Sequence, residues 1–163
     1  MKKLVFIVEG DSEAEFVNRI MTTYFASKGI HHIWPIKISK TGESGGYNNI
    51  DHFKNTIKLV LFNKEEPVIT TFIDHYGINS EKKMPGYDRI KNEPVEKKLA
   101  MMEKKLNEVV QSIKPYRYFV PHIQRHEYET LLLADPEKGF AFEDEQIKKD
   151  VLKLFLKQRF RTI

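Results

Sequence analysis

Cysteine is absent from the 163 residues of the chain. Its absence excludes a disulfide scaffold, a zinc site built on thiolates and a catalytic thiol nucleophile. A chain of this length can bury roughly 70% of its extended surface in one domain, so it can fold without such crosslinks. We therefore expect a single domain over residues 1–163, and a cysteine-free chain fits a cytoplasmic location.

Long apolar runs are absent too. Lys2 and Lys3 precede the apolar stretch Leu4–Val8, which ends at Glu9. This stretch is too short for a secretory signal peptide, and no later run approaches the ~20 apolar residues of a membrane span. The sequence therefore predicts no membrane partner. It also contains no internal repeat, low-complexity tract or interdomain linker.

The formal net charge of +4 is modest, but it is distributed unevenly along the chain. The last sixteen residues, 148–163, carry six Lys or Arg against one Asp. A phosphate-rich partner such as nucleic acid suits a basic tail of this kind. The solvated end of a helix has the same composition, so the sequence leaves both interpretations open.

Four apolar or β-branched stretches have the composition of strands. They cover residues 3–8, 32–39, 68–73 and 116–123. Helical patterns follow each strand, over residues 12–29, 50–61, 94–110, 127–134 and 144–160. This alternation, with crossovers long enough for parallel pairing, predicts a three-layer α/β domain with a mainly parallel central sheet and helices on both faces.

Local patterns predict where some of these elements begin and end. Ser12 with Glu15 matches the S-x-x-E capping box at the start of the first helix, and Gly29 is expected to end that helix. Two loops are expected, a Gly- and Ser-rich one over residues 41–49 and a long polar one over residues 75–92. Loops as long as the second are usually functional or mobile.

Titratable side chains follow three of the four expected strands. They are Glu9 and Glu13 after the first strand, Asp74 and His75 after the third, and Arg125, His126, Glu127 and Glu129 after the fourth. In open parallel sheets, functional sites form outside the carboxyl ends of the strands. We therefore expect these side chains to meet at one edge of the sheet.

Carboxylates crowded at one edge repel one another unless cations compensate their charge. Oxygen ligands of this type suit Mg²⁺ or Mn²⁺, which stabilise the attacking and leaving oxygens in phosphodiester cleavage. The candidate metal ligands are Glu9, Glu13, Asp74, Glu127 and Glu129, and the candidate phosphate contacts are His75, Arg125 and His126. Acids near helix N-termini also serve as caps, so that simpler role stays open for the residues that follow a strand.

Three blocks of sequence resemble one protein family. Val8–Glu13 resembles the V-E-G-x-[ST]-E opening of Toprim-like proteins, and Phe72–Gly77 with Met84–Gly86 resembles one branch of that group. Pro121–Leu132 and the following Ala134–Pro136 fit the same branch, a bacterial family of uncharacterised proteins related to the overcoming-lysogenisation-defect nucleases. The resemblance covers roughly residues 3–140.

This resemblance implies a Toprim-like fold with a Mg²⁺-dependent nuclease-type site. By motif position, Glu9 matches the acid/base glutamate and Asp74 matches the first metal-binding aspartate. The resemblance further implies a nucleic-acid substrate, a partner ATPase, an association with anti-phage defence, and a homodimer as one possible assembly.

The chain departs from the family pattern in two places. Tyr76 stands where Toprim proteins carry the second aspartate of an Asp-x-Asp pair, so Glu127 or Glu129 is the candidate for the missing ligand. Family members also continue past the Asp-Pro segment, whereas residues 143–163 are expected to form only a C-terminal helix. That helix is consistent with a naturally short, a truncated or an altered C-terminus.

Two other function classes compete with a metal-dependent nuclease. A Toprim-like module without activity could bind a partner ATPase or nucleic acid, which the missing second aspartate favours. A phosphoreceiver-like regulator would use Asp74 as its phosphate acceptor, but it needs a lysine after the last strand, and Lys114 precedes the fourth strand. A metalloprotease is excluded because Thr130 replaces the second histidine of H-E-x-x-H.

Overall fold

The computed structural model describes residues 3–38, 46–127, 129–141 and 143–159. They fall into two compact units, Met1–Arg125 and His126–Ile163, and each unit is described by itself. The first unit contains the sheet, and the second consists of helices. The single domain expected over residues 1–163 stays a prediction. Most of the expected loop at 41–49 lies outside the described residues.

The first unit is built on a five-stranded parallel sheet. Its strands are β1 (Leu4–Val8), β2 (Ile33–Lys37), β3 (Val68–Asp74), β4 (Phe119–Val120) and β5 (Ile123–Gln124). The order across the sheet is β2-β1-β3-β4, and β5 also pairs with β3. Every pair is parallel, as the sequence predicts.

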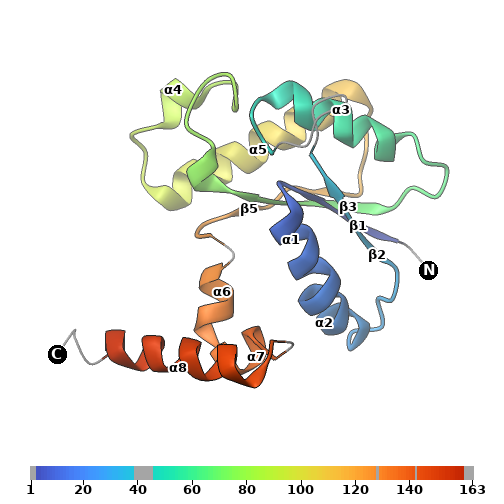
Figure 1. Cartoon of the computed structure of the whole chain (residues 1–163). Helices are drawn as coiled ribbons and strands as arrows, with labels where there is room; N and C mark the ends of the chain where they lie inside the picture. The colour runs from blue at the N-terminus through green and yellow to red at the C-terminus, as the bar shows by residue number, and fades with distance from the viewer. Residues whose placement is uncertain (1–2, 39–45, 128, 142, 160–163) are drawn as a thin grey trace. The chain divides into compact units, whose positions relative to one another are not determined.

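Helices cover both faces of this sheet (Figure 1). One face carries α3 (Ile50–Leu61) and α5 (Val95–Ile113). The other carries α1 (Asp11–Phe16) and α2 (Thr22–Ala26), which are joined by the π-helical turn η1 (Val17–Met21). The predicted three-layer α/β architecture is therefore confirmed.

Apolar side chains of β1 and β3 are buried on both faces, which explains their continuous apolar composition. Val5 and Ile7 belong to the core cluster that includes residues of α3 and α5. On the opposite face, Phe16 of α1 stacks on Phe72 with ring centroids 5.6 Å apart. The five apolar positions that predict α3 are all buried, namely Ile50, Phe53, Ile57, Val60 and Leu61. The helical period in the sequence thus identifies the buried face of α3 correctly.

The first helix begins two residues earlier than the predicted capping box. Gly10 is its N-cap, and the Glu13 side chain accepts a hydrogen bond from the Gly10 amide at 2.8 Å. The Ser12–Glu15 box is therefore wrong, because the helix starts at Asp11 and already includes Ser12 in its first turn. Gly29 follows α2 with φ at 80°, a left-handed value that suits glycine and ends the helix as predicted.

The expected strand at 116–123 is wrong as a continuous element. It is divided into β4 and β5, with Pro121 between them. Proline has no amide hydrogen to donate to a ladder, so it interrupts the strand. The Thr71 hydroxyl of β3 bridges the gap, because it accepts from the His122 amide at 2.8 Å and donates to the His122 carbonyl at 2.6 Å.

The long segment after β3 is an ordered connection rather than an open loop. It contains the 3₁₀ turn η2 (His75–Gly77) and the short helix α4 (Tyr87–Ile90). Ile78 and Met84 from this segment are almost fully buried in the core. The segment therefore packs along the carboxyl edge of the sheet on the α3 side.

One edge of the sheet is formed by β2. The Leu4 amide donates to the His32 carbonyl, and the Ile38 amide donates to the Val8 carbonyl. Alternate residues of a strand direct their backbone groups to opposite sides, so the backbone nitrogen of Pro35 lies on the open edge, away from β1. As a proline nitrogen it has no hydrogen to donate there.

The second unit contains three helices in its described part. They are α6 (Glu129–Ala134), α7 (Pro136–Gly139) and α8 (Glu145–Arg159). Asp144 caps α8 by accepting from the amides of Gln146 and Ile147 at 2.9 Å. The predicted break at Asp135-Pro136 and the predicted C-terminal helix are both present. None of the helices in the described ranges has the length and apolarity required to cross a membrane.

Candidate functional site

The two acids with the strongest sequence signal leave adjacent strands at the same edge of the sheet. Val8 of β1 lies opposite Phe72 of β3, Glu9 follows Val8 directly, and Asp74 is the last residue of β3. Asp74 is 7% exposed, and Glu9 is partly buried. The register thus places both acids at the carboxyl edge of the sheet, at the ends of adjacent strands.

Two glycines border the Glu9 carboxylate. A Cβ atom added at Gly77 would lie 3.5 and 3.6 Å from its two oxygens, and one added at Gly46 would lie 3.6 Å from Oε1. Gly77 belongs to η2, directly after Asp74, whereas Gly46 precedes α3. Backbone from two different segments therefore approaches Glu9, and neither segment places a side chain beside the carboxylate at these positions.

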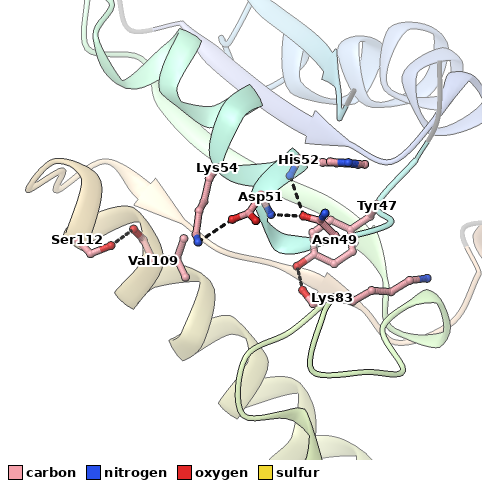
Figure 2. Close-up of polar contacts among 8 residues, drawn as sticks. All are labelled: Tyr47, Asn49, Asp51, His52, Lys54, Lys83, Val109 and Ser112. Atoms are coloured by element: carbon pink, nitrogen blue, oxygen red, sulfur yellow. Dashed lines mark hydrogen bonds and ion pairs between the residues drawn. The ribbon is translucent and has the colours of Figure 1, made fainter. Parts of the chain in front are cut away.

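Tyr47 is buried next to Glu9, with 1% of its surface exposed. Its hydroxyl donates to the backbone carbonyl of Lys83 at 2.6 Å (Figure 2). Burial, together with the negative charge of Glu9, raises the pKa of Tyr47 well above its usual value. Tyr47 is therefore a neutral hydrogen-bond donor throughout the physiological pH range.

Lys83 connects the segment after β3 to the surroundings of Glu9. Its ammonium donates to the Gly77 carbonyl at 2.6 Å. A second link in the same place is the Ile50 amide, which donates to the Lys82 carbonyl at 3.0 Å. The segment that carries Gly77 is thereby attached to the residues that lead into α3.

The first turn of α3 is capped by its own side chains (Figure 2). Asn49 accepts from the amides of Asp51 and His52 at 2.5 and 3.3 Å. The Lys54 ammonium hydrogen-bonds to Asp51 at 2.9 Å, which holds the pKa of this exposed carboxyl below its usual value. The Asn49 side chain thus already binds two of the amides that an anion at this helix terminus would need.

His75 and Arg125, two of the predicted phosphate contacts, meet in the structure. His75 Nδ1 lies 2.9 Å from the Arg125 carbonyl oxygen. A carbonyl only accepts hydrogen bonds, so His75 donates this one through Nδ1. The Arg125 guanidinium pairs with Glu96 at 2.8 Å.

The other predicted site residues lie in different surroundings. Glu13 binds the Gly10 amide as part of the α1 cap. His126 and Glu127 belong to the second unit and are exposed, and Glu129 is the first residue of α6. The position of the second unit relative to Glu9 and Asp74 is not determined, so the roles expected for these residues stay predictions.

The residues present at the edge fit a hard cation with few protein ligands. Within the described ranges, no group of three or more His, Asp or Glu is arranged to hold a metal ion. Mg²⁺ is usually bound by one or two carboxylates and completes its shell with water and substrate phosphates. Glu9 and Asp74 meet that requirement by residue type and by strand position.

Two hollows in the first unit lie away from this edge. One, of about 370 Å³, is lined by residues that include Lys3, Trp34 and Leu59. The other, of about 400 Å³, has a lining that includes Glu66 and Arg117. Neither lining contains Glu9 or Asp74, so neither hollow belongs to the candidate site.

Tyr47, Gly77 and Lys83 were not predicted as parts of the site. Gly77 ends the block Phe72–Gly77 and Lys83 directly precedes Met84, so two of the three adjoin sequence blocks that carry the family resemblance. Tyr47 has no comparable signal, because its contact with Lys83 joins residues 36 positions apart.

Comparison with known proteins identifies one family. A family model described as "Domain of unknown function (DUF4276)" matches residues 8–158, a span that includes Glu9, Asp74, Glu127 and Glu129. No curated protein and no solved structure matches the chain. The predicted membership in a family of uncharacterised proteins is confirmed, and the match reaches into α8.

Proposed function

This chain belongs to the DUF4276 family, which assigns it no activity, and we propose from its edge acids that it is a divalent-metal-dependent phosphodiesterase of the nuclease class. The metal is Mg²⁺ or Mn²⁺, and the substrate is a nucleic acid. The proposal includes the Toprim-like kinship of the site, which the motif around Glu9 supports.

The observation that carries this proposal is the position of Glu9 and Asp74 on adjacent parallel strands. Both are carboxylates at the carboxyl ends of their strands, where the sites of open parallel sheets form, and Asp74 is only 7% exposed. Carboxylate oxygens in such positions are ligands that Mg²⁺ and Mn²⁺ prefer.

The proposed chemistry divides the work between the two acids. When bound, the metal supplies Lewis acidity toward a phosphoryl oxygen and toward the leaving oxygen. Asp74 holds the metal at the end of β3. Glu9 orients the attacking water and accepts its proton at a carboxylate oxygen. Glu127 or Glu129 is the proposed further ligand, in place of the aspartate that Tyr76 replaces.

The proposed biological setting follows from the resemblance and from charge. A nucleic-acid substrate agrees with the basic residues of the segment 148–163, which suit phosphate contacts. A partner ATPase and a role in anti-phage defence are part of the same proposal, as is a cytoplasmic location.

The proposal is tested by titrating Mg²⁺ and Mn²⁺ into the protein in a calorimeter. Wild type is expected to bind saturably, and the Glu9→Gln/Asp74→Asn variant is expected to lose this binding. The matched control is Glu108→Gln/Asp88→Asn, which removes two exposed acids that each pair with a lysine three residues away. Binding that is equal in both double variants would contradict the site.

A second candidate function is a non-enzymatic module that binds an ATPase or a nucleic acid. It is favoured by the finding that the described residues hold no group of three metal-ligating side chains. This alternative predicts that Glu9→Gln retains partner binding and biological effect. The metal-dependent enzyme predicts that Glu9→Gln abolishes the effect.

A further inference from the structure

Three residues form a closed arrangement around Glu9, which we call the Glu9 clasp: Tyr47, Gly77 and Lys83. We propose that Tyr47 and Lys83 are positioning residues that hold Gly77 against the Glu9 carboxylate and so set its orientation. The inference rests on the proposed function in one respect, since the oriented carboxylate is taken to serve a metal site.

The clasp is held by two hydrogen bonds that share one residue. The Lys83 ammonium donates to the Gly77 carbonyl, and the Lys83 carbonyl accepts from the Tyr47 hydroxyl, each at 2.6 Å. Lys83 therefore holds both Gly77 and Tyr47, the two clasp residues that lie near Glu9. A hydrogen bond from a charged donor is among the stronger ones in proteins, which suits an element that has to hold a loop in place.

The absence of a side chain at Gly77 matters for its contact with Glu9. Among the glycines in the described ranges, the left-handed ones are Gly29, Gly46 and Gly86, so Gly77 does not need the conformational freedom of glycine. An alanine methyl at this position would instead make ordinary van der Waals contact with the carboxylate, at 3.5 and 3.6 Å from its oxygens. The missing side chain thus leaves the space of one methyl group between the backbone of Gly77 and the two carboxylate oxygens.

Tyr47 is the second clasp residue that lies near the Glu9 carboxylate. Its ring is buried and its pKa is raised partly by the charge of Glu9, which places the two groups within electrostatic reach. Since the Tyr47 hydroxyl is directed to the Lys83 carbonyl, it donates its proton there and not to Glu9 (Figure 2). Tyr47 therefore contributes to the clasp through its hydrogen bond to Lys83 and not through a hydrogen bond from its hydroxyl to Glu9.

The test compares Lys83→Met with Lys82→Met. These adjacent lysines allow the same loss of charge, but Lys82 contributes to the clasp region only through its backbone carbonyl. The first readout needs no metal: the ¹³C resonance of the Glu9 side-chain carboxyl, assigned by its loss in Glu9→Gln. We expect Lys83→Met to shift this resonance and Lys82→Met to leave it in place.

The second readout is Mn²⁺ affinity. Loss of one charged hydrogen bond is expected to weaken binding roughly tenfold in Lys83→Met, with little change in Lys82→Met. In the Glu9→Gln background, Lys83→Met should cause no further loss of Mn²⁺ affinity, because it acts through Glu9. A purely structural role for Lys83 would give additive losses.

Gly77→Ala is the second variant, chosen because it keeps both hydrogen bonds of the clasp. It should fold with wild-type stability and shift the Glu9 resonance. An unchanged Glu9 resonance in both Lys83→Met and Gly77→Ala would overturn the clasp. If wild type binds no Mn²⁺, the proposed function fails, and the metal-free resonance still decides whether the clasp exists.

Discussion

The Thr71 hydroxyl both accepts from the amide of His122 and donates to its carbonyl, at 2.8 and 2.6 Å. A side chain thereby replaces a pair of ladder hydrogen bonds in the interval where Pro121 separates β4 from β5. Thr71 is fully buried, so water cannot take over its role.

Thr71→Val is expected to lower the free energy of unfolding by about 1–3 kcal/mol, because it leaves backbone groups of His122 without their partner. Thr71→Ser retains the hydroxyl and should lose much less. Denaturant unfolding followed by circular dichroism measures both, with Thr70→Val on the neighbouring residue as control. Equal losses in Thr71→Val and Thr71→Ser would show that the methyl group matters, and not the hydroxyl.

Alkaline pH should weaken the fold through Tyr116. Burial, with a contribution from Glu66, raises its pKa from 10.0 to about 12, and its hydroxyl donates to the Pro67 carbonyl at 2.6 Å. Because the folded-state pKa exceeds the unfolded value, this stabilisation is complete below pH 10 and is lost as the pH rises toward 12.

Thermal unfolding between pH 8 and pH 12 tests this expectation by comparing wild type with Tyr116→Phe. The variant should be less stable by about 1 kcal/mol at the lower pH, since it lacks one hydrogen bond. The gap between the two proteins should narrow as the pH rises. A constant gap would exclude the ionisation of Tyr116 as the cause of the alkaline loss.

Two apolar residues of α3 should respond very differently to truncation. Ile57 is fully buried, so Ile57→Ala is expected to cost about 2–5 kcal/mol through lost burial and the cavity that remains. Leu59 is 77% exposed, and Leu59→Ala should change stability by no more than about 0.5 kcal/mol. The denaturant midpoints of the two variants provide the comparison. Similar losses of stability would contradict the orientation of α3 in which Ile57 faces the core and Leu59 faces solvent.

Mn²⁺ should raise the melting temperature of the protein if Glu9 and Asp74 bind it. A ligand that binds only the folded state stabilises it by about 2.7 kcal/mol when its concentration is a hundred times its dissociation constant. Differential scanning fluorimetry with and without Mn²⁺ measures this shift, and a chelator should reverse it. A shift that persists in Glu9→Gln/Asp74→Asn would assign the binding to another part of the chain.

The sequence predicts the architecture well where periodicity is strong. β1 and β3 are continuous apolar runs, and α3 repeats its apolar residues at helical spacing, so their positions are correct within a residue or two. The prediction fails at Pro121, because the composition of residues 116–123 is that of a strand while one missing amide divides it.

The candidate site is predicted only in part from the sequence. Glu9 and Asp74 are expected at one edge because each follows or ends an apolar stretch, and the register places both at the carboxyl edge of adjacent strands. The clasp residues cannot be predicted from local sequence patterns, because the hydrogen bonds of Tyr47 and Lys83 depend on how the segment after β3 folds back.

Pro35 has a consequence for how copies of this protein meet. A foreign strand laid beside β2 would miss a hydrogen bond in the middle of the added ladder, because Pro35 faces that open edge without an amide hydrogen. Sheet-to-sheet polymerisation through β2 is therefore suppressed, which protects a concentrated pool of the protein from fibrous aggregation. A homodimer that continues the sheet across β2 is disfavoured for the same reason.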